Sequence, residues 1–177
     1  ILEEKLELTD FHIPTLSIRG ASHSGKSETV RKLCTLSGIL PGKNCLSTES
    51  SLFSLQRTLE ITNFAPIIID EFKLTENGGN ANKLEMIRSL VRRVYSGETM
   101  TRGLADLSVR EFSLHAPLIV IGEHTLERVG DVAEYSRVMP IATDEYCTDE
   151  NAERMLAAQD VHYEWLAPLF YQFVLQK

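Results

Sequence analysis

Three short apolar runs define the pattern of this chain, and each leads into glycine or acidic residues. They are Thr15–Ile18, Ala65–Asp70 and Pro117–Gly122. Continuous apolar runs of this length predict strands that are buried on both faces of a sheet. Val138–Ala142 predicts a fourth buried strand, and Asn44–Ser47 a short one.

Helices are predicted between these strands, where apolar residues recur every three or four positions. Their ranges are Lys26–Leu36, Ser51–Thr62 and Lys83–Tyr95. Ser50 or Ser51 is suited to cap the second helix. The side chains expected near one side of the first helix, and inward on the third, are Val30, Leu33, Cys34 and Leu36, and Leu84, Ile87, Val91 and Val94.

Two segments that follow the predicted strand at Ala65–Asp70 are polar or contain turn residues. Thr75–Asn82 includes two adjacent glycines and predicts a mobile loop. Thr99–Arg102 and Val109–Leu114 predict a hairpin around Gly103–Asp106. This hairpin would be inserted before the strand at Pro117–Gly122.

Alternation of strands and helices predicts an α/β fold, a three-layer α/β/α sandwich with a mainly parallel central sheet. Ligands bind at the C-terminal ends of the strands in such sheets. We expect residues 1–145 to form this core. Residues 146–177, with helices predicted at Asn151–Ala158 and Tyr163–Leu175, are expected to lead to further domains. The chain begins at Ile1 rather than Met, which indicates a piece of a longer protein.

Composition narrows the partners of this fold. The 177 residues carry a net charge of −7, which excludes a broad basic face for nucleic acid, so any such contact is expected to be local. No apolar run approaches the ~20 residues that span a bilayer. The three cysteines lack the spacing of metal ligands and are typical of free thiols in a reducing compartment. We therefore expect a cytoplasmic protein without membrane contact.

A phosphate-binding motif follows the first strand and opens the first helix. Residues 20–27 satisfy G-x-x-x-x-G-K-[ST], the P-loop pattern, in the structural context that this pattern requires. Lys26 is expected to reach the β- and γ-phosphates of ATP, and the Ser27 hydroxyl to ligate Mg²⁺. His23 is either a loop-tip residue or a nucleotide contact. The residues expected to bind nucleotide are Gly20, Ala21, Ser22, His23, Ser24, Gly25, Lys26, Ser27 and Glu28.

Two adjacent carboxylates end the second buried strand. Asp70 lies 44 positions after Lys26, which leaves room for a helix, a strand and a second helix between them. Alone, such acids are usually just solvated. Together with the phosphate loop, Asp70 is expected to hold Mg²⁺ through water, and Glu71 to orient or deprotonate the attacking water.

The acidic pair resembles that of the large class of P-loop ATPases that carry an extra strand and a catalytic glutamate. In that class the third strand ends in a polar sensor of the γ-phosphate, usually Asn, Ser or Thr. Glu123 or His124 stands at this point here. Arg137 precedes the fourth strand, where ring-forming ATPases place an arginine that reaches the neighbouring subunit's site. The alternative is a surface arginine or a local salt bridge.

The order of the motifs resembles the ATPase domains that accompany primases in phages, plasmids and integrated elements, which are related to superfamily 3 helicases and AAA+ proteins. The resemblance runs from about Thr15 to Ala142. It implies a ring, usually a hexamer, that couples ATP hydrolysis to movement on single-stranded DNA, with a primase module as a possible companion. The motifs that carry it are the phosphate loop, Leu46-Ser47-Thr48, Ile69-Asp70-Glu71, Tyr95-Ser96-Gly97-Glu98, Thr101-Arg102-Gly103, Ile121-Gly122-Glu123 and Arg137.

Several arginines lie outside the phosphate site. Arg88 and Arg92, next to Arg93, are expected on the outward face of their helix, where they contact DNA phosphates or a neighbouring subunit or simply form a solvated face. The same alternatives apply to Arg102 and Arg110 on the hairpin. The leading function is an ATP-driven DNA motor. The alternative is a regulatory ATP switch that does not translocate, and a small-molecule kinase is a weaker third.

Overall fold

The structure is a computed structural model of the whole chain. It describes residues 12–36, 38–39, 45–47, 51–61, 65–72, 80–103, 108–114, 116–124, 126 and 132–143, and single positions from residue 150 onward. Residues 75–79 of the predicted loop, the hairpin turn, most of the predicted C-terminal helices and the boundary between residues 145 and 146 lie outside this part of the chain. Those expectations stay predictions.

A five-stranded parallel sheet forms the centre of the fold, in the order β2-β3-β6-β1-β7. β6 lies between β1 and β3, so an additional strand separates the strand before the phosphate loop from the strand with the acidic pair. All five predicted strands are present, with shifts at their ends. Their bounds are Thr15–Gly20 for β1, Cys45–Ser47 for β2, Ile67–Phe72 for β3, Leu118–Gly122 for β6 and Val138–Thr143 for β7.

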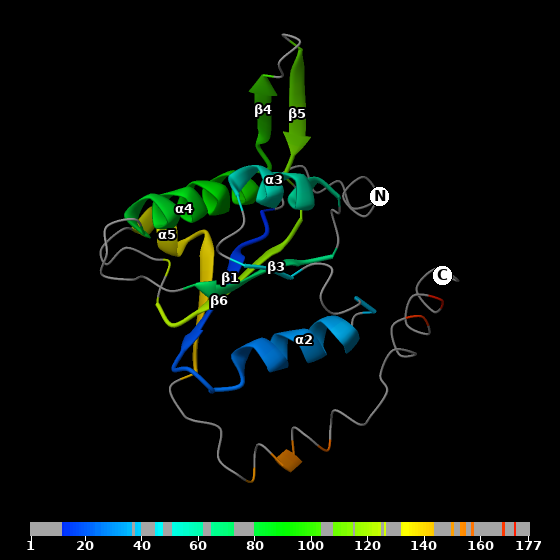
Figure 1. The fold of residues 1–177 in the computed structure, drawn as a ribbon, viewed down its shortest axis with the longest axis vertical. Helices are drawn as coiled ribbons and strands as arrows, with labels where there is room; N and C mark the ends of the chain where they lie inside the picture. The colour runs from blue at the N-terminus through cyan, green and yellow to red at the C-terminus, as the bar shows by residue number, and fades with distance from the viewer. Residues whose placement is uncertain are drawn as a thin grey trace.

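Helices cover both faces of the sheet and complete three layers (Figure 1). α2 (Lys26–Leu36) lies on one face, and α3 (Leu52–Ile61), α4 (Asn80–Ser96) and the short α5 (Val132–Tyr135) lie on the other. Alternate residues of each strand point to opposite faces. On β3, Ile69 therefore packs into the core under α3 and α4, while Ile68 packs toward α2.

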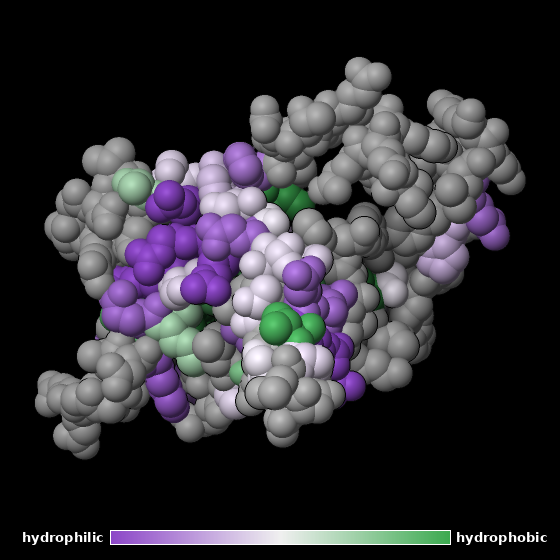
Figure 2. All heavy atoms as spheres, turned by 90° about the horizontal axis from the view of Figure 1, so that it is seen from above, coloured by the Kyte–Doolittle hydropathy of each residue, from purple (hydrophilic) through white to green (hydrophobic). Residues whose placement is uncertain are grey.

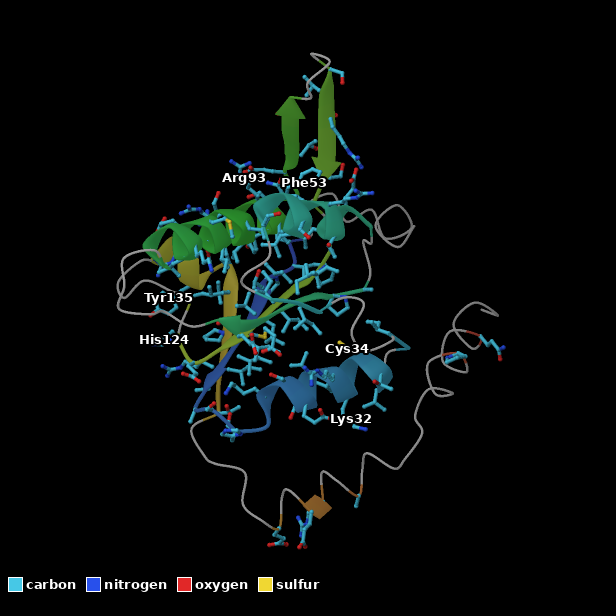
Figure 3. The ribbon with its side chains drawn as sticks, viewed as in Figure 1. Lys32, Cys34, Phe53, Arg93, His124 and Tyr135 are labelled. Carbon is cyan, nitrogen blue, oxygen red and sulfur yellow. The ribbon has the colours of Figure 1, made fainter. Side chains whose placement is uncertain are left out.

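The buried stripe of α2 is narrower than its sequence suggests. Val30 and Cys34, four positions apart, are buried against the sheet, and Figure 3 shows Cys34 between the helix and the strands. Leu33 and Leu36 are 54% and 38% exposed, so their expected place on the same packed side is wrong. Successive residues rotate by ~100° around a helix, which carries these two leucines past the edge of the contact.

The structure shows where α3 and α4 begin, which settles the predicted cap of α3 and shifts the predicted start of α4. Ser51 caps α3, because its Oγ accepts the backbone N–H of Ser54 over 3.2 Å. α4 begins at Asn80, so residues 80–82 belong to the helix and not to the predicted loop.

Arg88 does not lie on the outward face of α4, which contradicts the sequence prediction. Its side chain is only 10% exposed. Nε donates to the Leu126 carbonyl over 2.7 Å, and a terminal nitrogen donates to Glu85 over 3.2 Å. A guanidinium satisfied in this way supports packing and is not presented to an outside partner.

A separate two-stranded antiparallel sheet follows α4 and precedes β6 along the chain. β4 (Thr99–Gly103) pairs with β5 (Val109–Ser113), and the pair projects beyond the helical layer (Figure 1). An ion pair of 3.2 Å between Arg110 and Glu60 ties β5 to α3.

The surface at this end of the molecule is polar. In Figure 2, which looks at it from above, the apolar residues of the described part are scattered rather than gathered into one patch. Within the described residues, no helix has the length and apolar character needed to cross a bilayer.

Candidate active site

Parallel pairing brings the C-terminal ends of β1, β3 and β6 to one edge of the sheet. Arg19 is paired with Gly122, and Ile69 with Val120, so the residues that follow these strands meet. A pocket of about 300 Å³ opens there, a size in the range of small-molecule sites. It is lined by residues 22–28, by Asp70 and Glu71, and by residues 121–123.

The loop between β1 and α2 winds tightly at two positions. His23 has φ of 63° and Gly25 has φ of 78°, both in the left-handed region, which glycine adopts without steric cost. The first backbone bond of α2 runs from Thr29 N to Gly25 O over 2.9 Å. The N–H groups of a first helical turn have no partner inside the helix, and here they lie at the pocket. Such a helix start attracts phosphate.

Lys26 lies across the loop. Its ammonium donates to the Gly20 carbonyl over 2.9 Å, to the Ala21 carbonyl, and to the Ser24 hydroxyl over 3.0 Å. These three acceptors match the three N–H donors of a lysine. Gly20 and Ala21 thus contribute carbonyls behind the loop, while residues 22–28 form the pocket wall.

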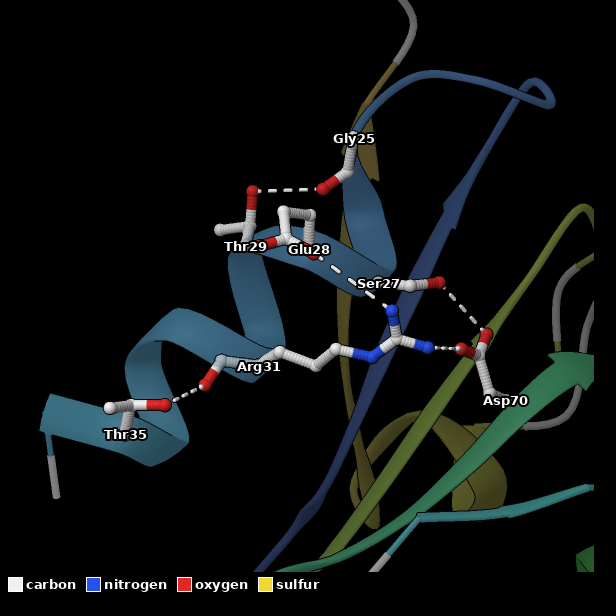
Figure 4. A network of polar contacts seen from close by, with 7 residues as sticks. All are labelled: Gly25, Ser27, Glu28, Thr29, Arg31, Thr35 and Asp70. Carbon is white, nitrogen blue, oxygen red and sulfur yellow. Dashed lines mark hydrogen bonds and ion pairs between the residues drawn. The ribbon is translucent and has the colours of Figure 1, made fainter. Parts of the chain in front are cut away.

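Ser27 and Asp70 meet directly at the pocket (Figure 4). The Ser27 hydroxyl donates to Asp70 Oδ1 over 3.0 Å. Because its single proton is directed at Asp70, the oxygen keeps lone pairs for a cation. Hydroxyl and carboxylate oxygens are the ligands that Mg²⁺ takes from proteins. The two residues therefore fit a magnesium site.

A backbone irregularity places both acidic side chains on the same pocket. Successive residues of a regular strand point to opposite faces. The pairing of β3 with β6 shifts between Ile69 and Phe72, and Glu71 has φ of 63°. Its N–H donates to Asp70 Oδ1 over 2.8 Å. This conformation costs a non-glycine residue of order 1–3 kcal/mol and is typical of functional positions.

The chain has the same fold as a known helicase. The SCCmec type IV Cch active helicase matches 99% of this chain at 21% identity with a TM-score of 0.62. The chain spans only 31% of that protein's length. This likeness shows the P-loop α/β fold.

Two further solved structures resemble the chain at TM-scores below 0.5. One is a Signal Transduction ATPase with Numerous Domains (STAND) protein from Pyrococcus horikoshii, which has a tetratricopeptide repeat sensor. It matches 96% of this chain and 27% of its own at 14% identity and a TM-score of 0.44. JCV helicase matches 87% of this chain and 44% of its own at 12% identity and a TM-score of 0.47. No family model and no curated protein matches the chain.

Arg31 is a site residue that the sequence analysis missed. Its guanidinium lies 3.9 Å from Asp70 Oδ2 and 3.9 Å from a carboxylate oxygen of Glu28 (Figure 4). It follows Ser27 by one helical turn, so the spacing alone placed it on the same side of α2. With its side chain 49% exposed, its charge is well screened by water.

The two sensor candidates differ in position. Glu123 follows β6 and lines the pocket, whereas His124 is exposed and is not among the residues that line it. An acidic residue, Glu123, therefore borders the pocket at the end of β6.

Arg137 lies at the N-terminal ends of the strands, whereas the pocket lies at their C-terminal ends. Its carbonyl accepts the N–H of Thr15, the first residue of β1, over 2.9 Å. At ~3.3 Å per residue, the length of β1 separates it from the phosphate loop by roughly 20 Å. Its guanidinium donates to the Ala133 carbonyl over 3.0 Å. Arg137 therefore does not belong to the site of its own chain.

Proposed function

We propose that this chain is an ATP-hydrolysing domain that binds Mg·ATP between its phosphate loop and Asp70–Glu71. The 3.0 Å bond between Ser27 and Asp70 carries the proposal, because it joins the two motifs at one pocket. A glycine-rich turn without function would not require a carboxylate from another strand at this distance.

Each residue of the proposed site has a separate task. The loop N–H groups and the start of α2 hold the phosphates. Lys26 exchanges its loop acceptors for β- and γ-phosphate oxygens, and Ser27 and Asp70 hold the metal. Mg²⁺ held there would supply positive charge that offsets the charge of the phosphates.

Glu71 is proposed as the general base. It lines the pocket one residue beyond Asp70, and the residue is exposed. A base at this place orients the attacking water and accepts its proton. Glu123 is proposed as the sensor in preference to His124, because only Glu123 borders the pocket.

We further propose that the domain drives a DNA motor, assembled as a ring on single-stranded DNA. The projecting β4–β5 pair supplies an element that can face a central channel. Arg137 is proposed to act on a neighbouring subunit's site, because it lies roughly 20 Å from the phosphate loop of its own chain. A primase module as companion is part of this proposal.

ATP hydrolysis with and without single-stranded DNA tests the proposal. We expect the wild-type chain to hydrolyse ATP, single-stranded DNA to raise the rate, and Lys26→Ala to abolish it. Slow hydrolysis by a monomer that ignores DNA would favour the regulatory switch. Equal hydrolysis by wild type and Lys26→Ala would contradict the site itself.

A further inference from the structure

The last residue of β7 contacts the phosphate loop across the edge of the sheet. Thr143 is paired with Gly20, and its hydroxyl donates to the Arg19 carbonyl over 3.0 Å. The same oxygen lies 3.2 Å from the Ser24 hydroxyl. Ser24 and Thr143 are 119 positions apart, so the fold alone brings them together.

The direction of each bond in this cluster follows from the donors available. A threonine hydroxyl has one proton. Since that of Thr143 is directed at Arg19, Ser24 must donate to Thr143. Ser24 then accepts from the Lys26 ammonium over 3.0 Å. The result is a continuous chain of bonds from Lys26 through Ser24 and Thr143 to the Arg19 carbonyl, and such chains strengthen cooperatively.

The packing at Gly20 supports the same contact. A Cβ added to Gly20 would collide with the hydroxyl and the carbonyl oxygen of Thr143 and would lie 3.2 Å from the Ser24 hydroxyl. The entry of the loop and the end of β7 are therefore in close contact, without room for a side chain.

We propose that Thr143 is a positioning residue of the phosphate loop, which holds Ser24 and the loop entry in the arrangement that binds nucleotide. The proposal rests on the assignment of this loop to ATP. Thr143 does not border the pocket, so its effect passes through Ser24. A loop held in its binding arrangement loses less entropy when the ligand enters.

The test compares Thr143→Val, which keeps the branched shape without the hydroxyl, with Thr143→Ser, which keeps the hydroxyl. Thr58→Val is the matched control, because it removes a comparable 2.9 Å bond to a backbone carbonyl within α3. A fluorescent ATP analogue with Mg²⁺ reports the Kd. Hydrogen exchange of the loop amides reports loop order without nucleotide.

We expect Thr143→Val to raise the Kd about tenfold, the effect of roughly one lost hydrogen bond, and to speed exchange at residues 21–25. Thr143→Ser should stay within about threefold of wild type, and Thr58→Val should change neither measurement. The effect of Ser24→Ala should shrink in the Thr143→Val background, because both changes break one chain of bonds.

Unchanged or tighter binding by Thr143→Val, with unchanged loop exchange, would overturn the positioning role. Equal damage by Thr143→Ser would also overturn it, since shape rather than the hydroxyl would then be responsible. If wild type and Lys26→Ala bind the analogue equally, the ATP assignment fails, and the exchange comparison still decides whether Thr143 orders the loop.

Discussion

The hydroxyl of Ser27 donates a 3.0 Å hydrogen bond to Oδ1 of Asp70, a residue 43 positions further along the chain. The same Oδ1 accepts the N–H of Glu71 over 2.8 Å. One carboxylate oxygen thus joins the phosphate loop to the candidate catalytic base, and it fixes both relative to the pocket.

Asp70→Asn should lower the apparent affinity for Mg²⁺ in ATP hydrolysis. An amide keeps the shape but loses the charge that holds the metal's water, so the Mg²⁺ concentration for half-maximal rate should rise ~10–100-fold. Glu60→Gln is the matched control, because it makes the same chemical change in the ion pair with Arg110. A Mg²⁺ titration that is identical for Asp70→Asn and wild type would show that Asp70 is not at the metal.

Local patterns were sufficient to predict the framework of this site. The apolar runs, the helix period and the glycine–lysine–serine motif are each written in a few neighbouring residues, and the structure confirms a strand, a loop and a helix starting at Lys26. The acidic pair after the second buried strand was likewise predicted to lie at this edge of the sheet, because parallel strands end together.

The features that the sequence did not reveal depend on residues far apart in the chain. The left-handed Glu71 follows from the register of β3 on β6, which no local pattern specifies. The contact of Thr143 with Ser24 needs β7 beside β1. The burial of Arg88 needs the Leu126 carbonyl, which lies in a loop 38 positions away. An arginine on an apparently polar helix face gives no sign of such a partner.

Arg88→Ala should lower the free energy of unfolding by about 1.5–3 kcal/mol, because the Leu126 carbonyl loses a charged donor. Arg154→Ala is the control. Arg154 makes a 2.7 Å pair with Glu150, but the two side chains are 75% and 72% exposed. Such pairs contribute ~0–1 kcal/mol. Denaturant unfolding measures both variants. If the two variants are equally stable and Arg88→Ala binds DNA more weakly, Arg88 would instead have the outward role that the sequence predicts.

Arg137 should act on the site of a neighbouring subunit. Arg137→Ala and Lys26→Ala should each be nearly inactive, because an arginine that stabilises the departing phosphate contributes ~10³–10⁵ in rate. Rings mixed from both variants should regain activity, since some interfaces combine an intact Lys26 with an intact arginine. The steady-state ATPase rate of the mixture measures this. No recovery in rings shown to be mixed would count against the trans role, and full activity of Arg137→Ala alone would remove it from the mechanism.

Binding and hydrolysis of ATP by Glu71→Gln test the central claim most directly. The glutamine keeps the size of the side chain at the pocket and loses its basicity. We measure the Kd for Mg·ATP and the single-turnover hydrolysis rate of the same protein, with wild type and Lys26→Ala beside it. The proposed site predicts near wild-type affinity together with hydrolysis slowed ~10²–10⁴-fold. A Glu71→Gln variant that hydrolyses bound ATP at the wild-type rate would contradict the assignment of Glu71 as the general base of this pocket.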